Sequence, residues 1–179
     1  QNKYGGTQSI NGEELWLGCP LVVHRRCIDP MFRISNQVAY NGRMFLKTNG
    51  PDPTRKFLLS QSVWFDYKGA ELGSKDHSVQ QQTQMVKELF KQAISVYSGL
   101  PDLYIITPFT SVEAKIKDAL RRVIKEQIPG LRVDEIRKWL DDNCGTIHTF
   151  QGKEATEVLL VLGCDAQSGQ GAARWVGKK

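Results

Sequence analysis

The chain has 179 residues, of which 40% are hydrophobic and 24% are charged, and its net charge is +5. This composition is ordinary for a globular protein, and no apolar run reaches the about 18 residues that a membrane-spanning helix needs, so we expect no membrane contact. Cys19, Cys27, Cys144 and Cys164 are scattered without the close spacing of a zinc site, which favours a reducing, cytoplasmic environment and no bound metal.

Residues 1–20 show no signal-peptide pattern and no initiator Met, and we expect a lead-in to a segment of a longer protein. A short extended run from Pro20 to Cys27 follows and contains Arg26. Asp29-Pro30 then predicts a helix start and Asn41-Gly42 its end. An arginine before a helix can bond two phosphate oxygens at once, although it can also lie over a sheet edge in contact with solvent.

The middle of the chain alternates between strand and helix patterns. We expect a surface connection over 43–62, a strand over the aromatic run 63–67, and a helix over 78–97 with one apolar stripe. The apolar run 103–107 predicts a buried strand, and Thr110 to Glu113 predicts a capping box that starts a helix ending near residue 127. A shorter helix is expected after that, at Val133, Ile136 and Leu140.

The loop between the strand at 103–107 and its helix contains Thr107, Pro108, Phe109 and Ser111. Hydroxyls and the free N–H groups of a helix start can contact a nucleic-acid backbone. Alternatively, Thr107-Pro108 only ends the strand and the lysines of the helix form a solvated face.

Near the end of the chain, strands expected at 145–150 and 158–163 enclose the loop Gln151-Gly152-Lys153-Glu154. The run from Val158 to Leu162 is apolar at every position, which is typical of a strand buried on both faces of a parallel sheet. Glycine lets backbone approach a ligand, lysine can meet a phosphate, and a carboxylate can accept from a ribose hydroxyl. The alternative is a tight turn with a solvated Lys-Glu pair.

Three of these segments, in order, resemble motifs of superfamily 1 helicases. GTIHTFQGKE resembles the fifth motif in the branch that contains the nonsense-decay RNA helicases and the bacterial relatives of the Okazaki-processing helicase-nuclease. Arg26 with ISNQVAYNGRM is similar to the fourth motif, and IITPFTSVEAKIKDAL to a segment whose loop touches the nucleic acid. The resemblance covers about Trp16 to Gly163, and nothing like the family's sixth motif follows.

The alternation of strands and helices is the βαβ signature of an α/β fold. The resemblance implies a RecA-like three-layer fold with a mostly parallel central sheet and helices on both faces. It would occupy residues 21–163 as the second RecA-like domain of the helicase, and we expect a partly disordered tail over 164–179.

The resemblance further implies an ATP-dependent DNA or RNA helicase, a nucleoside-triphosphate hydrolase with the P-loop NTPase fold. ATP with Mg²⁺ would bind only together with the N-terminal RecA-like domain of the same chain, and the other partner would be single-stranded DNA or RNA. It assigns Arg26 to the γ-phosphate as the catalytic residue, Gly152, Lys153 and Glu154 to the nucleotide, and Thr107, Pro108, Phe109, Ser111, Thr146, His148 and Thr149 to the nucleic acid.

No GxxxxGK[ST] sequence and no acidic pair after an apolar strand occurs in the chain. Phosphoryl transfer needs both a phosphate cradle and a bound metal ion, so we expect this segment alone not to hydrolyse ATP. One alternative is a non-catalytic nucleic-acid-binding or protein-interaction module with the same fold. Another is a different α/β enzyme with His148 as a base, which no Ser or Cys nucleophile motif accompanies.

Overall fold

The computed structural model describes residues 5–18, 22–50, 52–67, 69–73 and 76–164. The chain divides into two compact units, Gln1–Arg55 and Lys56–Lys179, and each is described by itself. The domain expected at 21–163 therefore has parts in both units. Apart from Cys164, the expected tail lies outside the described residues.

The first unit begins with an antiparallel hairpin of β1 (Gly5–Ile10) and β2 (Glu13–Gly18). Its turn is Asn11-Gly12, with φ angles of 55° and 87°. Positive φ at both central residues is the geometry of the two-residue hairpin turn that Asn-Gly favours, because its twist matches that of the strands. The lead-in expected at residues 1–20 thus contains regular structure.

A small βαβ unit follows, in which β3 (Val23–His24) pairs in parallel with β4 (Phe45–Leu46) and α1 (Met31–Tyr40) connects them. The Asn36 side chain fixes the helix to the returning chain. Its Nδ2 donates to the Met44 carbonyl at 3.0 Å, and its Oδ1 accepts the Met44 N–H at 3.0 Å. One amide therefore satisfies both backbone groups of the residue before β4.

The helix at α1 has the ends that the sequence predicts. The Asp29 carboxylate accepts the Arg33 N–H at 3.1 Å in the first turn, although Pro30 occupies the cap position itself. Asn41 ends the helix in the left-handed conformation, with φ of 50°. Asn and Gly tolerate that conformation better than other residues, which is why Asn41-Gly42 predicts the end of the helix.

The second unit is built on a three-stranded parallel sheet in the order β8-β7-β9. Its central strand, β7 (Leu103–Thr107), is where the apolar run predicted it, and all five of its residues are buried. The edge strands are β8 (Cys144–Thr146) and β9 (Glu157–Leu160). The fold class is therefore α/β, as expected.

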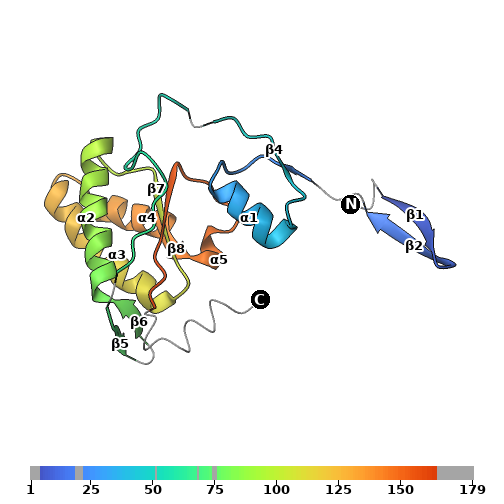
Figure 1. The fold of residues 1–179 in the computed structure, drawn as a ribbon. Coiled ribbons are helices and arrows are strands. Elements are labelled where there is room, and N and C mark those ends of the chain that lie inside the picture. The colour runs from blue at the N-terminus through green and yellow to red at the C-terminus, as the bar shows by residue number, and fades with distance from the viewer. Residues whose placement is uncertain (1–4, 19–21, 51, 68, 74–75, 165–179) are drawn as a thin grey trace. The chain divides into compact units, whose positions relative to one another are not determined.

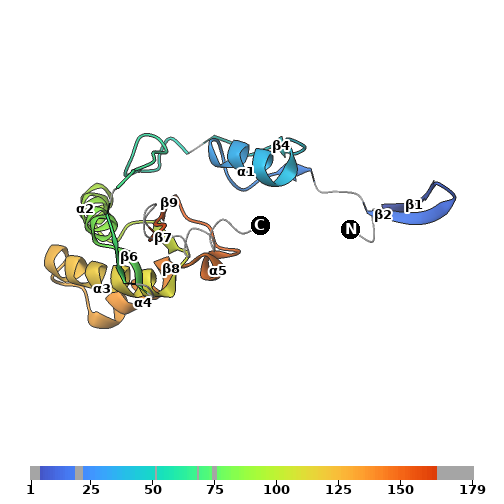
Figure 2. The ribbon, with the colours of Figure 1, turned by 60° about the horizontal axis from the view of Figure 1, so that its bottom comes forward.

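Helices pack on one side of this sheet. α2 (Gln80–Tyr97), α3 (Thr110–Gln127) and α4 (Val133–Asn143) lie together on that side in both ribbon views (Figures 1 and 2). Their apolar stripes follow the predicted helical spacing and form the core with the sheet. Its largest fully buried side chains include Phe90, Ile105, Ile116, Leu120, Ile124 and Leu140. Each such side chain contributes about 1.5–3 kcal/mol through removal from water.

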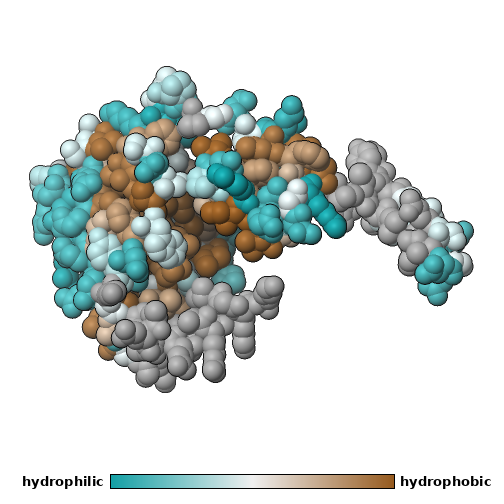
Figure 3. All heavy atoms as spheres, in the orientation of Figure 1, coloured by the Kyte–Doolittle hydropathy of each residue, from teal (hydrophilic) through white to brown (hydrophobic). Residues whose placement is uncertain are grey.

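The opposite face of the sheet is less completely covered. Along β9, Leu159 packs against the core, whereas Val158 and Leu160 point the other way and are 44% and 52% exposed. Hydrophobic side chains gather over the sheet in the space-filling view, and hydrophilic ones over the outer helices (Figure 3). The apolar run at 158–162 was expected to be buried on both faces, and for Val158 and Leu160 this is wrong.

The strand predicted at 63–67 is not formed. Trp64 is 74% exposed, and Val63, Phe65 and Tyr67 are also exposed. Their high β propensity does not make a strand by itself, because that propensity expresses packing on a paired, half-buried surface. A short antiparallel ribbon of β5 (Glu71–Gly73) and β6 (Asp76–Val79) comes later instead, directly before α2.

The strand predicted at 145–150 is likewise shorter than expected. After β8 the chain turns into α5 (Ile147–Phe150), a single helical turn on the other side of the sheet from α4 (Figure 1). The Thr149 hydroxyl donates to the Thr146 carbonyl at 2.8 Å and closes this turn. A side-chain bond to the backbone three residues earlier competes with a strand ladder, which a count of β-prone residues does not register.

Glu157, at the start of β9, ties the beginning of the second unit to the sheet. Its carboxylate accepts the Leu58 N–H at 2.8 and 2.9 Å and lies 3.0 Å from the Tyr97 hydroxyl. We expect Glu157→Ala to lower the free energy of unfolding by about 1–3 kcal/mol, because these donors lose their acceptor. Chemical denaturation measures this. Glu126→Ala, at an exposed position of α3, is the control, and an equal effect of both changes would contradict the role.

Candidate nucleic-acid interface

Two of the predicted loops follow neighbouring strands and leave the sheet at the carboxyl ends of these strands. β7 and β8 run in parallel with Thr107 opposite Thr146, so the chain departs from both strands at adjacent positions. Both threonines are buried, at 1% and 8% exposure, and the Thr107 Oγ1 accepts the Phe109 N–H at 3.4 Å. Their side chains therefore shape the two loops from within the edge.

The loop after β7 leads directly into α3. Pro108 is buried, while Phe109 and Ser111 are partly exposed. The expected capping box is wrong: Phe109 is the cap residue, and it makes no side-chain cap hydrogen bond. Glu113 pairs instead with Lys117, at 2.9 Å between Oε1 and Nζ. Backbone N–H groups at a helix start and the positive end of the helix dipole suit an anion.

The loop after β8 presents the α5 turn. His148 and Thr149 are exposed there, and Ile147 is half exposed. Gly145 lies underneath, since a Cβ on it would come 2.1 Å from the Thr149 Oγ1. Glycine at this position lets Thr149 fold back onto the end of β8. This end of the sheet thus carries the His148 imidazole on a turn that is closed by the bond from the Thr149 hydroxyl to the Thr146 carbonyl.

The loop Gln151 to Glu154 begins with a tight turn that runs from Phe150 to Lys153. The Lys153 N–H donates to the Phe150 carbonyl at 2.9 Å, Gln151 has φ and ψ of −55° and 122°, and Gly152 has φ of 86°. These are the angles of a type II turn, which requires positive φ at its third residue. The turn geometry alone therefore accounts for Gly152, while Lys153 and Glu154 lie exposed after it.

The Lys153 ammonium is engaged within the second unit. Its Nζ lies 3.3 Å from the Asp142 carbonyl at the end of α4 and 5.3 Å from the centre of the Tyr104 ring. Tyr104 in turn meets Phe150 edge to face, with ring centres 4.7 Å apart. A cation beside the last carbonyls of a helix and over an aromatic ring is favourable without any ligand.

A group of residues that sequence reasoning missed supports the loop after β7. His77 of β6 stacks on Phe109, with ring centres 4.2 Å apart, and its Nδ1 lies 2.9 Å from Glu71 Oε2. Asp76 pairs with Lys115 of α3 and accepts the Ser78 hydroxyl at 2.6 Å. The Lys115 ammonium and then the Ser78 hydroxyl lower the pKa of Asp76 to about 2. The Asp76-x-Ser78 spacing, typical of a side-chain turn, is the only signal in the sequence.

Arg26 belongs to the first unit and is exposed in the connection from β3 to α1. The bend there is held by His24, whose Nε2 accepts the Cys27 N–H at 3.0 Å and whose ring lies 5.2 Å from that of Phe32. Arg26 and the predicted nucleotide residues Gly152, Lys153 and Glu154 are thus in different units.

The cysteines near these positions are poor nucleophiles. Burial raises the pKa of the Cys144 thiol to about 12. Burial also raises the pKa of Cys27, although its Sγ lies 3.1 Å from His24 Nε2. Because the thiolate is the reactive form, neither site suits covalent catalysis at neutral pH.

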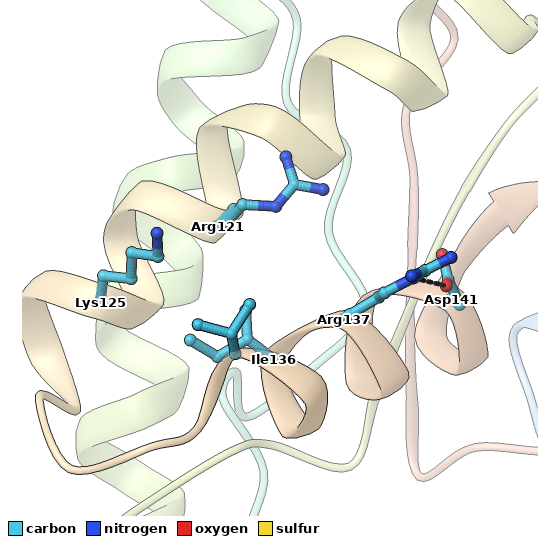
Figure 4. Close-up of a pocket in the computed structure, with 6 residues that line it drawn as sticks. Arg121, Lys125, Ile136, Arg137 and Asp141 are labelled. Atoms are coloured by element: carbon cyan, nitrogen blue, oxygen red, sulfur yellow. Dashed lines mark ion pairs between the residues drawn. The ribbon is translucent and has the colours of Figure 1, made fainter.

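A hollow of about 220 Å³ lies between α3 and α4, lined by Arg121, Lys125, Val133, Ile136, Arg137 and Asp141 (Figure 4). Arg137 pairs with Asp141 one turn further along α4, at 3.7 Å between Nε and Oδ2. None of the predicted site residues lines this hollow, which is formed by the last turns of α3 rather than its start. It is therefore separate from the sheet edge described above.

Among the residues that the structure describes, no group of three or more His, Cys, Asp or Glu side chains is placed to hold a metal ion. Within the same residues, no helix is both long and apolar enough to cross a bilayer. Comparison of the chain with protein-family models, with curated proteins and with solved structures finds no match.

Proposed function

We propose that the chain is the second RecA-like domain of a superfamily 1 helicase, an ATP-dependent motor that moves along single-stranded DNA or RNA. One observation carries the proposal: Thr107 lies opposite Thr146, so the two segments that resemble strand-contacting helicase motifs leave the parallel sheet at one edge. Open α/β sheets bind ligands at the carboxyl ends of their strands. The second, finer part of the proposal is a three-layer fold, which requires a further helical layer over the face that bears Val158 and Leu160.

The proposed contacts to the nucleic acid hold its sugar-phosphate backbone and do not distinguish its base sequence. The N–H groups at the start of α3 and the Ser111 hydroxyl suit phosphate oxygens. His148, exposed on α5, adds a ring for a base, and the proposed contact of Thr149 is made beside it while its hydroxyl donates to the Thr146 carbonyl. The net charge of +5 adds a general attraction for a polyanion.

The proposed nucleotide contacts are Arg26, Gly152, Lys153 and Glu154, with ATP and Mg²⁺ held mainly by an N-terminal RecA-like domain. Arg26 would meet the γ-phosphate, because a guanidinium is always charged and can bond two oxygens at once. The magnesium ion would neutralise charge on the β- and γ-phosphate oxygens. Opening and closing of the cleft around ATP would then move the loops after β7 and β8, which contact the nucleic acid, in each cycle of ATP hydrolysis.

Binding of single-stranded nucleic acid by the full-length protein tests the proposal. We expect a fluorescein-labelled single-stranded oligonucleotide to bind with an affinity that falls steeply between about 50 and 200 mM salt, and to bind differently when a non-hydrolysable ATP analogue is present. His148→Ala should weaken binding about 5- to 100-fold if the ring stacks on a base. Fluorescence anisotropy measures all three effects.

Lys138→Ala is the control, because Lys138 is exposed on α4, pairs with Asp142 at 2.8 Å and is not among the proposed contacts to nucleic acid. It should leave the affinity unchanged. Binding that is insensitive to salt, or equal losses in His148→Ala and Lys138→Ala, would contradict the proposed interface.

A second candidate, a nucleic-acid-binding module without a nucleotide response, is favoured by the environment of Lys153. Its ammonium contacts the Asp142 carbonyl and the Tyr104 ring, and Gly152 is explained by the turn. In that case the oligonucleotide binds with the same salt dependence, and the ATP analogue changes nothing. The anisotropy experiment therefore separates the two functions.

A further inference from the structure

We propose that His77 is a positioning residue for the loop between β7 and α3, and that it acts by holding the Phe109 ring through direct ring-to-ring contact. This inference rests on the function proposed above, because it assigns a role within the same interface. His77 lies on the short β5–β6 ribbon, which no motif resemblance assigned to the nucleic acid.

The ring contact is close and its geometry is fixed on the His77 side. The imidazole and the Phe109 ring have centres 4.2 Å apart and are tilted by 39°. The His77 Nδ1 lies 2.9 Å from Glu71 Oε2, and the Glu71 side chain is only 9% exposed. A nearly buried carboxylate on one ring nitrogen sets the orientation of the imidazole plane.

The backbone of His77 is held from two further directions. Its carbonyl lies close to Gly163, where a Cβ would come within 3.1 Å of the His77 O and 2.6 Å of Val112 Cγ2. Asp76 joins the same strand to Lys115 of α3. The ribbon backbone that carries His77 is therefore held against the first turns of α3 and the chain after β9.

Phe109 is the residue through which this support reaches the interface. It stands between Pro108 and the first turn of α3, where it is the cap residue, and its N–H bonds to Thr107 Oγ1. Any change in the direction of its side chain is coupled to the backbone that carries the proposed phosphate contacts. His77 thus influences the affinity of the protein for single-stranded nucleic acid without contacting the nucleic acid itself.

Three substitutions separate the ring from the hydrogen bond. His77→Ala removes both, His77→Asn keeps a donor for Glu71 but no ring, and His77→Phe keeps a ring but no donor. We expect the dissociation constant for the labelled single-stranded oligonucleotide to rise about 3- to 10-fold in His77→Ala and His77→Asn, the range of an aromatic pair contact. His77→Phe should stay within about twofold of the parent protein.

The thermal unfolding midpoint of each variant is measured alongside binding by the full chain, well below that midpoint. A purely structural role would make affinity follow stability, so that His77→Asn, which keeps the Glu71 bond, would bind best. That order, or unchanged binding in all three variants while the parent protein binds, overturns the inference and leaves the proposed function intact. Failure of the parent protein to bind the oligonucleotide overturns both.

Discussion

Arg26→Ala in the full-length protein is expected to lower strand-stimulated ATP turnover by about 10³-fold or more, the effect of removing an arginine that stabilises charge on a transferring phosphate. The reason is that charge spreads over the γ-phosphate oxygens as the bond to the β-phosphate breaks, and a planar guanidinium can bond two of them. Arg26→Lys should restore only part of the rate, because an ammonium acts as a single point charge. Phosphate release with and without single-stranded DNA or RNA measures the effect.

Arg33→Ala is the matched control for this change. Arg33 is an exposed arginine of the same unit, on α1, where it lies 3.9 Å from Asp29. Its loss should leave turnover unchanged, since exposed ion pairs contribute little. Circular dichroism should show that both variants fold. Parent-like turnover in Arg26→Ala would remove Arg26 from the proposed mechanism.

Leu120→Ala is expected to lower the free energy of unfolding of the second unit by about 3–5 kcal/mol. Leu120 is fully buried, with 0% exposure, in the core that α3 shares with the sheet. The change removes apolar surface from that core and leaves a cavity that tightly packed neighbours cannot fill. We expect the melting temperature to fall by about 10 °C or more.

Leu72→Ala is the matched control, because it makes the same chemical change in β5, where Leu72 is 59% exposed. Its effect should stay within about 0.5 kcal/mol, as for most surface substitutions. Differential scanning calorimetry of both variants decides the point. Similar losses for Leu120→Ala and Leu72→Ala would mean that the core of the second unit does not lie where the structure has it.

The parts of the fold that the sequence predicts well are those with local causes. The helix over Met31–Tyr40 follows Asp29-Pro30 and ends at Asn41, and α2 and α3 have apolar stripes that bury one face. The strand at Leu103–Thr107 is apolar throughout and lies in the centre of its sheet. Each of these elements is determined by residues a few positions apart.

The parts that the sequence predicts poorly depend on distant partners. Val63 to Tyr67 are as β-prone as β7, yet no strand forms there, because pairing is decided by the remainder of the fold. The turn at α5 depends on one hydroxyl bond, from Thr149 to Thr146. The local propensity of a segment shows neither its pairing partner in the fold nor a single hydrogen bond from a side chain to the backbone.

The candidate site shows the same division. The segments after β7 and β8 are recognisable from their residues, and the sheet register then brings Thr107 and Thr146 together. His77 was missed because its contact with Phe109 joins residues far apart in the chain. Gly152 was predicted to allow close approach of a ligand, whereas its positive φ is already demanded by the turn.

The edge position of β9 has a consequence for handling the protein. The run from Glu157 to Gly163 is rich in β-prone apolar residues and has no proline, and its first part, Glu157–Leu160, is the edge strand β9. Segments of this kind template pairing with other chains when they become accessible, which leads to aggregation. The charged residues Lys153 and Glu154 just before the run, and Glu157 at its start, then act as gatekeepers that oppose such pairing.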